Sequence, residues 1–233
     1  MNETKWVVVK LAVYVLFAGS SVLMLATLFR PTAPYSAYLA IDFATFLAFT
    51  YAYYKTKDKF WLISLASVPL MFISDLYFIP SFSFVFPRGI GVGMNMWAGL
   101  HMVVLSLGCF LYFGKSFMNY ANLIALFATI LTNLSFSTFL LSRPAIGYVT
   151  ALIWQTIVIY YLVYYSMKKK KFVFSTGAIV WFTGLFIIVL YYFFVSKDIQ
   201  SITVTVTDKV ITFGRGLMGV GVFESWRRTS EVS

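Results

Sequence analysis

The sequence predicts an all-α fold, a polytopic transmembrane helix bundle of seven to eight spans. Three observations lead to this prediction: 61% of the 233 residues are hydrophobic, only 11% are charged, and the apolar residues gather in long runs. Soluble domains average about 45–50% apolar and about 25% charged residues. A chain of this composition cannot cover its surface with polar groups, so lipid is the solvent that we expect for it.

Seven apolar runs approach the ~20 residues that an α-helix needs to cross a bilayer. They are Trp6–Phe29, Tyr35–Tyr54, Phe60–Ile79, Gly93–Phe113, Tyr120–Leu141, Ala145–Met167 and Phe172–Val195. Prolines and charged residues separate the runs, notably at Arg30–Pro34, Lys55–Lys59, Ser142–Pro144 and Lys168–Lys171. Pro69 falls inside the third run, where it should kink the helix and free a backbone carbonyl.

Residues 1–195 therefore form a predicted seven-span bundle, and residues 196–233 form a C-terminal tail. In the tail, Ser201–Thr207 alternates as a β-strand does, and Val210–Phe223 is a glycine-spaced apolar run interrupted by Arg215. The 14 residues of that run are short for a span. The run is therefore either an interfacial helix or a poor eighth span, and we favour the span because it returns Arg227 and Arg228 to the side of the N-terminus.

The basic residues predict the orientation and the partners. Nine lysines between or before the runs fall on the side of the N-terminus, against three arginines on the other side. This imbalance predicts a multi-pass integral membrane protein with a cytoplasmic N-terminus. Membrane lipids, with anionic headgroups at the cytoplasmic face, are the expected partners. No nucleic acid is expected, because the net charge of +10 is spread over short clusters between apolar runs; a homo- or hetero-oligomer stays open.

Three ionisable residues inside the apolar runs form the candidate site. Asp42, Asp75 and His101, the only histidine, all lie within about eight residues of the non-cytoplasmic ends of their runs. Ionisable groups within a membrane span are costly and usually have both a partner and a function. A carboxylate beside an imidazole can perform general acid–base catalysis or relay protons. We therefore predict that Asp75, His101 and Asp42 are catalytic.

Structural roles remain open for each of these residues. Asp75 could be a solvated residue at a helix end, and Asp42 could pair with Arg30 or with an interfacial water. His101 could hydrogen-bond to the carbonyl that Pro69 frees. In these cases the three side chains would support the bundle and perform no chemistry.

Further polar residues complete the predicted site. Asn95 lies above His101 in the fourth run, and Gln155 and Thr183 fall near mid-depth in later runs. They are the predicted substrate-binding residues, although such side chains commonly join helices by hydrogen bonds. No metal or cofactor is expected, because one histidine, one cysteine and two intramembrane carboxylates suit neither a transition metal nor haem.

Ser74-Asp75 at the end of the third run is followed by Gly93, Trp97 and His101-Met102 in the fourth. The sixth run contains Gly147–Ile153, and Gly177-Ala178 lies early in the seventh. In these residues the chain resembles the YhhN family of lysoplasmalogenases. The resemblance implies a helical bundle with a cytoplasmic N-terminus that hydrolyses the vinyl-ether bond of a lysophospholipid. Asp75 would then protonate the alkenyl group or activate water, and His101 would orient Asp75 or share its proton.

The chain departs from the family at three places. Ile41-Asp42 replaces a Lys-Pro pair, Gly184-Leu185 stands near the position of a second aspartate, and Val210–Phe223 hardly resembles the family's last span. If hydrolysis requires both carboxylates, the chain is a degenerate relative or Asp42 substitutes. The alternative function is a proton- or solute-coupled transporter or channel, or a non-catalytic subunit of a membrane complex.

Overall fold

The computed structural model describes residues 3–30, 35–76, 101, 104, 156, 159–194 and 200–224. These residues contain no strand; they form α1 (Glu3–Ala26), α2 (Tyr35–Thr56), α3 (Lys59–Leu76), α7 (Phe172–Phe194), α8 (Gln200–Gly221) and a helix over 159–168. The predicted all-α class is confirmed, while the number of spans stays a prediction. The predicted runs Gly93–Phe113, Tyr120–Leu141 and Ala145–Met167 lie largely outside the described residues.

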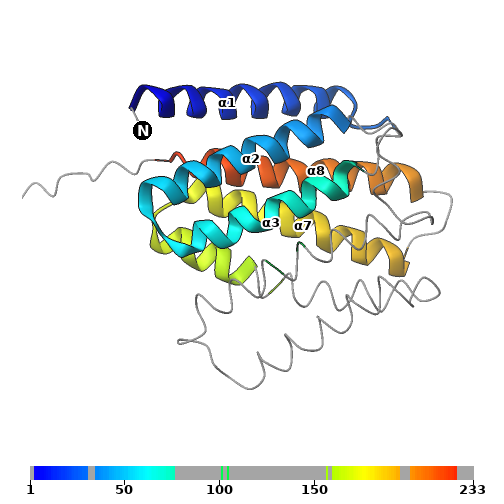
Figure 1. The fold of residues 1–233 in the computed structure, drawn as a ribbon. Helices are drawn as coiled ribbons and strands as arrows, with labels where there is room; N and C mark the ends of the chain where they lie inside the picture. The colour runs from blue at the N-terminus through cyan, green and yellow to red at the C-terminus, as the bar shows by residue number, and fades with distance from the viewer. Residues whose placement is uncertain are drawn as a thin grey trace, which may run out of the picture.

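The described helices run side by side, and successive neighbours reverse direction (Figure 1). The N-terminus of α1, the α2–α3 turn, the turn before α7 and the end of α8 gather at one end. Ring contacts agree with this arrangement, because Tyr51 of α2 packs against both Trp6 (4.9 Å between centroids) and Phe223 (5.0 Å). We call residues 55–59, 168–171 and 222–224 the turn end.

The C-terminal tail contains a full-length helix, α8, of 22 residues. Two predictions for this region are wrong: Ser201–Thr207 is helical rather than extended, and the helix begins ten residues before Val210, at Gln200. The physical reason is that α8 packs antiparallel along α7, and tertiary packing outweighs the β-propensity of alternating Val, Thr and Ile. A helix of 22 residues spans ~33 Å, enough for the hydrocarbon core of a bilayer.

Glycines bring the backbones of α7 and α8 into direct contact. A Cβ atom on Gly214 would lie 2.4 Å from the backbone nitrogen of Trp181, and one on Gly177 would lie 2.5 Å from that of Met218. No larger residue fits at such distances without moving a helix. Small residues that allow close backbone approach are characteristic of helix pairs in membranes.

Reciprocal caps join the same two helices at the turn end. The Lys171 ammonium donates to the carbonyls of Val222 (2.7 Å) and Glu224 (3.0 Å) at the end of α8. The Val173 amide, in the first turn of α7, donates to the Glu224 carboxylate at 2.8 Å. A cation thus lies at a helix C-terminus and an anion at a helix N-terminus, where the helix dipoles favour them. Burial lowers the pKa of Lys171, and the negative charge of Glu224 opposes this shift.

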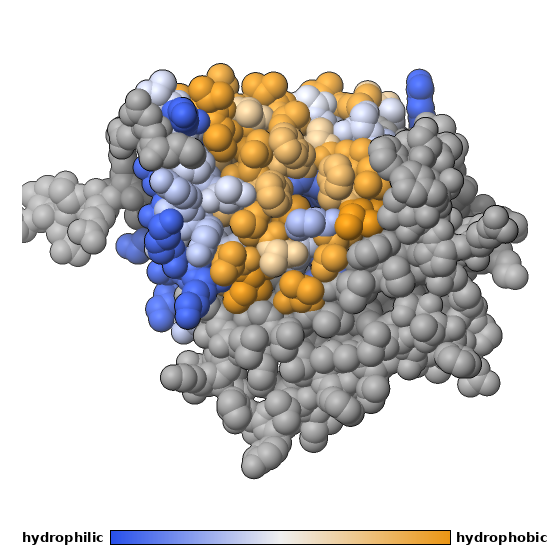
Figure 2. All heavy atoms as spheres, in the orientation of Figure 1, coloured by the Kyte–Doolittle hydropathy of each residue, from blue (hydrophilic) through white to orange (hydrophobic). Residues whose placement is uncertain are grey.

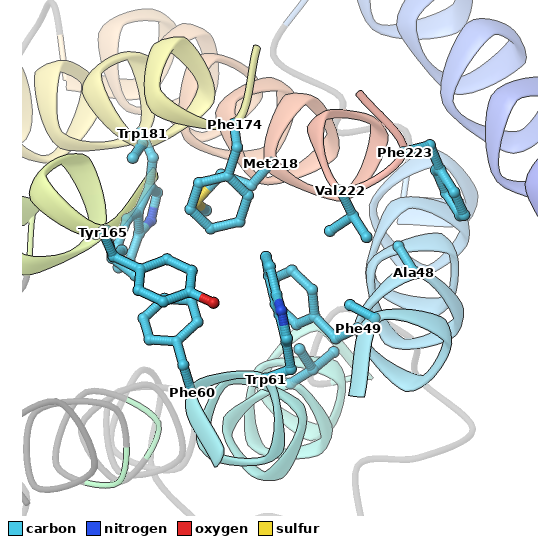
Figure 3. Close-up of a cluster of buried hydrophobic side chains, with 14 of the residues drawn as sticks. Ala48, Phe49, Phe60, Trp61, Tyr165, Phe174, Trp181, Met218, Val222 and Phe223 are labelled. Carbon is cyan, nitrogen blue, oxygen red and sulfur yellow. The ribbon is translucent and has the colours of Figure 1, made fainter. Parts of the chain in front are cut away.

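An aromatic core fills the bundle next to the turn end. Figure 3 shows Phe49, Trp61 and Phe174 converging from α2, α3 and α7, with Phe60 and Tyr165 beside them. The rings of Phe60 and Tyr165 are stacked at a centroid distance of 3.8 Å. Such rings bury large apolar areas, so this core fixes α3 against the helix over 159–168.

The outer surface of the bundle is apolar. On α1, side chains at helical spacing are more than three-fifths exposed, among them Val8, Leu11, Val15, Val22 and Leu25. Figure 2 shows hydrophobic residues along the helices and hydrophilic residues gathered at the turn end. Among the described residues, one helix, Thr4–Ala26, is by length and composition able to cross a membrane.

Candidate functional site

Three charged side chains from three helices form a buried cluster. Nη1 of Arg215 on α8 lies 2.7 Å from Oδ1 of Asp42 on α2, and its Nη2 lies 3.0 Å from Oδ2 of Asp75 on α3. At most 10% of any of these side chains is exposed. Arg215 Nη2 also donates to the Thr212 hydroxyl at 3.1 Å. The planar guanidinium thus bridges two carboxylates, which a lysine ammonium could not do in this geometry.

The α2–α3 turn brings the two carboxylates to the same depth. Asp42 lies 14 residues before the end of α2 at Thr56, and Asp75 lies 16 residues after the start of α3 at Lys59. At 1.5 Å per residue these separations are ~21 and ~24 Å. Two antiparallel helices joined by a short turn therefore place both side chains at about the same level. This agrees with the prediction that both lie near the same ends of their runs.

Arg215 reaches that level along its own helix. The Thr45 hydroxyl lies 3.5 Å from the Arg215 carbonyl, so the Arg215 backbone is level with the turn of α2 that follows Asp42. Side chains of a helix tilt toward its N-terminus. The guanidinium therefore extends away from the turn end and toward the carboxylates.

Arg215 is the functional residue that sequence reasoning missed. In the sequence, Arg215 is visible only as an interruption of an apolar run. The suggested pairing of Asp42 with Arg30 is wrong, because Asp42 pairs with Arg215. Arg30 is exposed, and its carbonyl accepts a hydrogen bond from Lys209 at 3.3 Å. The available signal was charge: an arginine inside an apolar run needs a buried acceptor, and Asp42 and Asp75 lie in other runs.

A small cavity borders the cluster. Its volume is about 30 Å³, and Asp42, Thr45, Ser67, His101 and Arg215 are among its lining residues. The Asp42 Oδ2 and the Arg215 Nε are buried and have no hydrogen-bond partner among the described residues. Buried polar atoms are normally hydrogen-bonded, and a cavity of about 10–15 Å³ is already large enough for one water. The cavity can therefore hold one water molecule next to the cluster.

His101 lines this cavity in a defined orientation. Its Nδ1 lies 2.7 Å from the carbonyl oxygen of Ser67 on α3. A carbonyl only accepts hydrogen bonds, so Nδ1 is the donor, and Nε2 is the acceptor of the neutral ring. The ring packs edge-on against Trp181 at 6.3 Å. His101 thus binds a carbonyl near Pro69, but not that of Leu65, whose helical donor Pro69 removes.

The predicted site residues do not all come together. The structure gathers Asp42 and Asp75 on Arg215, with His101 on the same cavity. No hydrogen bond joins the described side chains of His101 and Asp75, so the predicted direct His101–Asp75 pair is replaced by an Arg215–Asp75 pair. Thr183 is exposed on α7, and its hydroxyl donates to the Ile179 carbonyl at 2.9 Å. Asn95 and Gln155 lie outside the described residues.

The position at which the resemblance would place a second carboxylate is a helix contact. A Cβ atom on Gly184 would lie 2.6 Å from Cγ1 of Ile211, so α8 occupies the space that a side chain would need. The second carboxylate of the cluster comes from α2 instead, as Asp42. Within the described ranges, no group of three or more His, Cys, Asp and Glu could hold a metal ion.

The arrangement can hold a proton and a water molecule near one another. A guanidinium stabilises negative charge, and a carboxylate oxygen and an imidazole can donate or accept a proton. The resemblance to lysoplasmalogenases stays a prediction based on the residues that carry it. Comparison of the chain with protein-family models, with curated proteins and with solved structures gives no match in any of the three.

Proposed function

We propose that this chain is a multi-pass membrane protein, with a cytoplasmic N-terminus, that hydrolyses the vinyl-ether bond of a lysophospholipid at the Asp42–Arg215–Asp75 cluster. One observation supports this function above the others. Asp42, whose Oδ2 is buried without a partner among the described residues, lines a cavity large enough for a water molecule together with His101 and Arg215. Vinyl-ether hydrolysis needs a proton donor and a water molecule at one place.

The charge of the cluster suggests which group donates the proton. One guanidinium and two carboxylates carry a net negative charge when both carboxylates are ionised, and a buried uncompensated charge is costly. A single added proton makes the cluster neutral. We assign that proton to Oδ2 of Asp42, because this oxygen is buried and has no hydrogen-bond partner among the described residues. Asp42 therefore takes the acid role that the sequence assigned to Asp75.

The reaction balances with these groups. Asp42 gives its proton to the double-bond carbon that is not bonded to the ether oxygen, and the water attacks the resulting oxocarbenium ion at the carbon that is bonded to oxygen. The water's proton passes to the carboxylate or to Nε2 of His101, and the hemiacetal then breaks into an aldehyde and the glycerol hydroxyl. One water is consumed and the cluster regains its proton. Asp75 holds Arg215 in place, and Arg215 orients Asp42.

The departures from the family are consistent with a relocated set of charges. The resemblance implies a cation on the second span and a second carboxylate on the seventh. In this chain the carboxylate lies on α2, as Asp42, and the cation lies on α8, as Arg215. Both sets contain one cation and two carboxylates. The remaining lining of the cavity is largely apolar and includes Phe49, Leu162 and Met218.

Aldehyde release from a lysoplasmalogen by purified protein tests the proposal. We expect wild type to release aldehyde from the vinyl-ether lipid and not from its saturated alkyl-ether analogue. Asp42→Asn should lower the rate at least about 100-fold, the range of general acid catalysis. Asp58→Asn is the matched control, because Asn caps the start of α3 as well as Asp does. Equal rates for wild type and Asp42→Asn would refute the hydrolase.

A proton-coupled transporter is the second candidate. The cluster ties α2, α3 and α8 together, so adding or removing a proton on a carboxylate would change the contacts among three helices. Proton flux into proteoliposomes that is lost in Asp42→Asn, without aldehyde release from any lipid, would support this function. Aldehyde release without flux would exclude it.

A further inference from the structure

Two lysines hold a backbone conformation that usually belongs to glycine. Lys57 and Lys170 both have φ of 55°, and in the described part of the chain they are the non-glycine residues with positive φ. The left-handed region is sterically unfavourable for a residue with a Cβ atom. Helices commonly end with glycine in this conformation, so two lysines there call for a reason other than backbone geometry.

Each lysine terminates a helix at the turn end. The Lys57 amide, after α2, donates to the Tyr53 carbonyl at 2.8 Å. After the helix over 159–168, the Lys170 amide donates to Met167 (3.0 Å) and the Lys171 amide to Ser166 (2.7 Å). The second pattern is the Schellman motif, in which glycine normally occupies the place of Lys170. Glycine would satisfy both turns, so the lysine side chains are what distinguishes them.

The two turns form one surface. The Tyr165 hydroxyl donates to Oδ2 of Asp58 at 2.7 Å, and the ammonium of Lys169 lies 3.9 Å from the same oxygen. The stacked rings of Phe60 and Tyr165 hold the turns together from beneath. The positions of the lysines relative to one another are therefore fixed by contacts between α3 and the helix over 159–168.

This surface is strongly basic. Six exposed lysines stand against one carboxylate, that of Asp58, whose other oxygen already caps α3 through the Phe60 amide at 3.1 Å. The lysines are Lys55, Lys57, Lys59, Lys168, Lys169 and Lys170. Figure 2 shows the hydrophilic side chains gathered at this end, next to the apolar face. Like charges so close together repel, unless an anion lies among them.

We propose that the paired turns bind the headgroups of anionic phospholipids in the membrane leaflet that they face. The ammonium groups match the phosphate charge, and two of them lie over aromatic rings: Lys57 over the exposed Tyr54 at 4.4 Å and Lys169 over the buried Tyr165 at 5.7 Å. An exposed tyrosine such as Tyr54 suits the headgroup level of a bilayer. The inference rests on the proposed membrane location, but not on the proposed hydrolysis.

The left-handed lysines offer a test that separates charge from fold. The variant Lys57→Gly with Lys170→Gly removes two charges while giving both turns their preferred residue. We expect its melting temperature in zwitterionic detergent to equal or exceed that of wild type. Added phosphatidylglycerol should raise the wild-type melting temperature more than phosphatidylcholine does, and the double variant should lose at least half of that difference.

Two controls define the site. Arg30→Gln removes an exposed charge at the other end of the bundle and should keep the whole difference between the lipids. The double variant Lys59→Gln with Lys168→Gln removes two charges without changing the left-handed positions. If all six lysines contribute to one headgroup site, it should lose as much of the lipid-dependent difference in melting temperature as the double glycine variant does. A double glycine variant that keeps the full phosphatidylglycerol effect would overturn the inference, as would an equal loss in Arg30→Gln.

Two further measurements test whether the bound anion is a lipid headgroup or free phosphate, and whether lipid binding is independent of the proposed hydrolysis. Inorganic phosphate alone should not reproduce the phosphatidylglycerol effect; if it does, the surface binds free anions and the assignment to lipid is wrong. Asp42→Asn should retain the full lipid effect. A failed hydrolase assay with an intact lipid effect would then refute the proposed reaction alone, and the reverse outcome would refute only the headgroup site.

Discussion

α1 and α8 are nearly equal in length but differ in burial and in where their charges lie. The charged residues of α1 are confined to its first eight residues, Glu3 to Lys10, and the rest of the helix is uncharged. From Val7 to Phe29, seven large hydrophobic side chains are more than three-fifths exposed, up to 77% at Phe29. α8 contains Asp208, Lys209 and Arg215, and its side chains from Ile211 onward are largely buried. The more polar helix is inside and the more apolar helix is outside.

This inversion favours lipid over water as the solvent around α1. In water, α1 would leave a long apolar stripe exposed, which soluble proteins avoid. In lipid, the exposed stripe has no cost, whereas the charges of α8 must find partners inside the bundle. Lys209 does so by donating to the carbonyls of Thr27, Leu28 and Arg30 at the end of α1. The charged helix thus holds the apolar helix in place.

Removing the charge of α8 gives the largest expected effect. Arg215→Ala leaves Asp42 and Asp75 buried beside each other without a cation, and breaking a buried ion pair in this way costs about 3–5 kcal/mol. Thermal unfolding in detergent should show a large loss of stability, and Asp42→Asn with Asp75→Asn in the same chain should restore part of it. A loss under ~1 kcal/mol would mean that water already screens the carboxylates.

Adding a charge to α1 gives the next effect. Val15 lies near the middle of the helix and is 61% exposed. In a bilayer, Val15→Asp should cost about 2.5–3.5 kcal/mol of insertion free energy, so the fraction recovered in membranes should fall sharply. In water a surface substitution of this kind would stay within about 0.5 kcal/mol. Val15→Leu is the control, and unchanged membrane recovery of Val15→Asp would contradict a lipid-facing α1.

A matched pair of glycine substitutions gives the smallest effects, with opposite signs. Gly214→Ala on α8 would put a methyl group 2.4 Å from the Trp181 nitrogen, and overpacking of this kind costs about 1–3 kcal/mol. Gly19→Ala on α1 meets no atom within 4 Å and should stabilise the helix by about 0.5–1 kcal/mol. Thermal unfolding of both variants measures the difference. Destabilisation by Gly19→Ala would reveal a partner on that face.

Much of the bundle could be predicted from the sequence because its signals are local. The runs of apolar residues predicted α1, α2, α3 and α7, and each predicted start and end lies within three residues of the observed one. The depths of Asp42 and Asp75 followed from the same helical rise, since both are counted from one turn. Thr183 was predicted to lie at the site from its depth, but it is exposed on α7. Depth alone does not say which side of a helix faces the bundle.

The sequence by itself determined the helical class, the apolar surface and the level at which the carboxylates lie, since these depend on composition and on a constant rise per residue. Only the tertiary structure decided that Ser201–Thr207 is helical, because its alternation is overridden by packing against α7. Tertiary structure also decided that Arg215 joins Asp42 and Asp75. That pairing connects residues up to 173 positions apart, and such distances in sequence are set by how helices pack rather than by any local pattern.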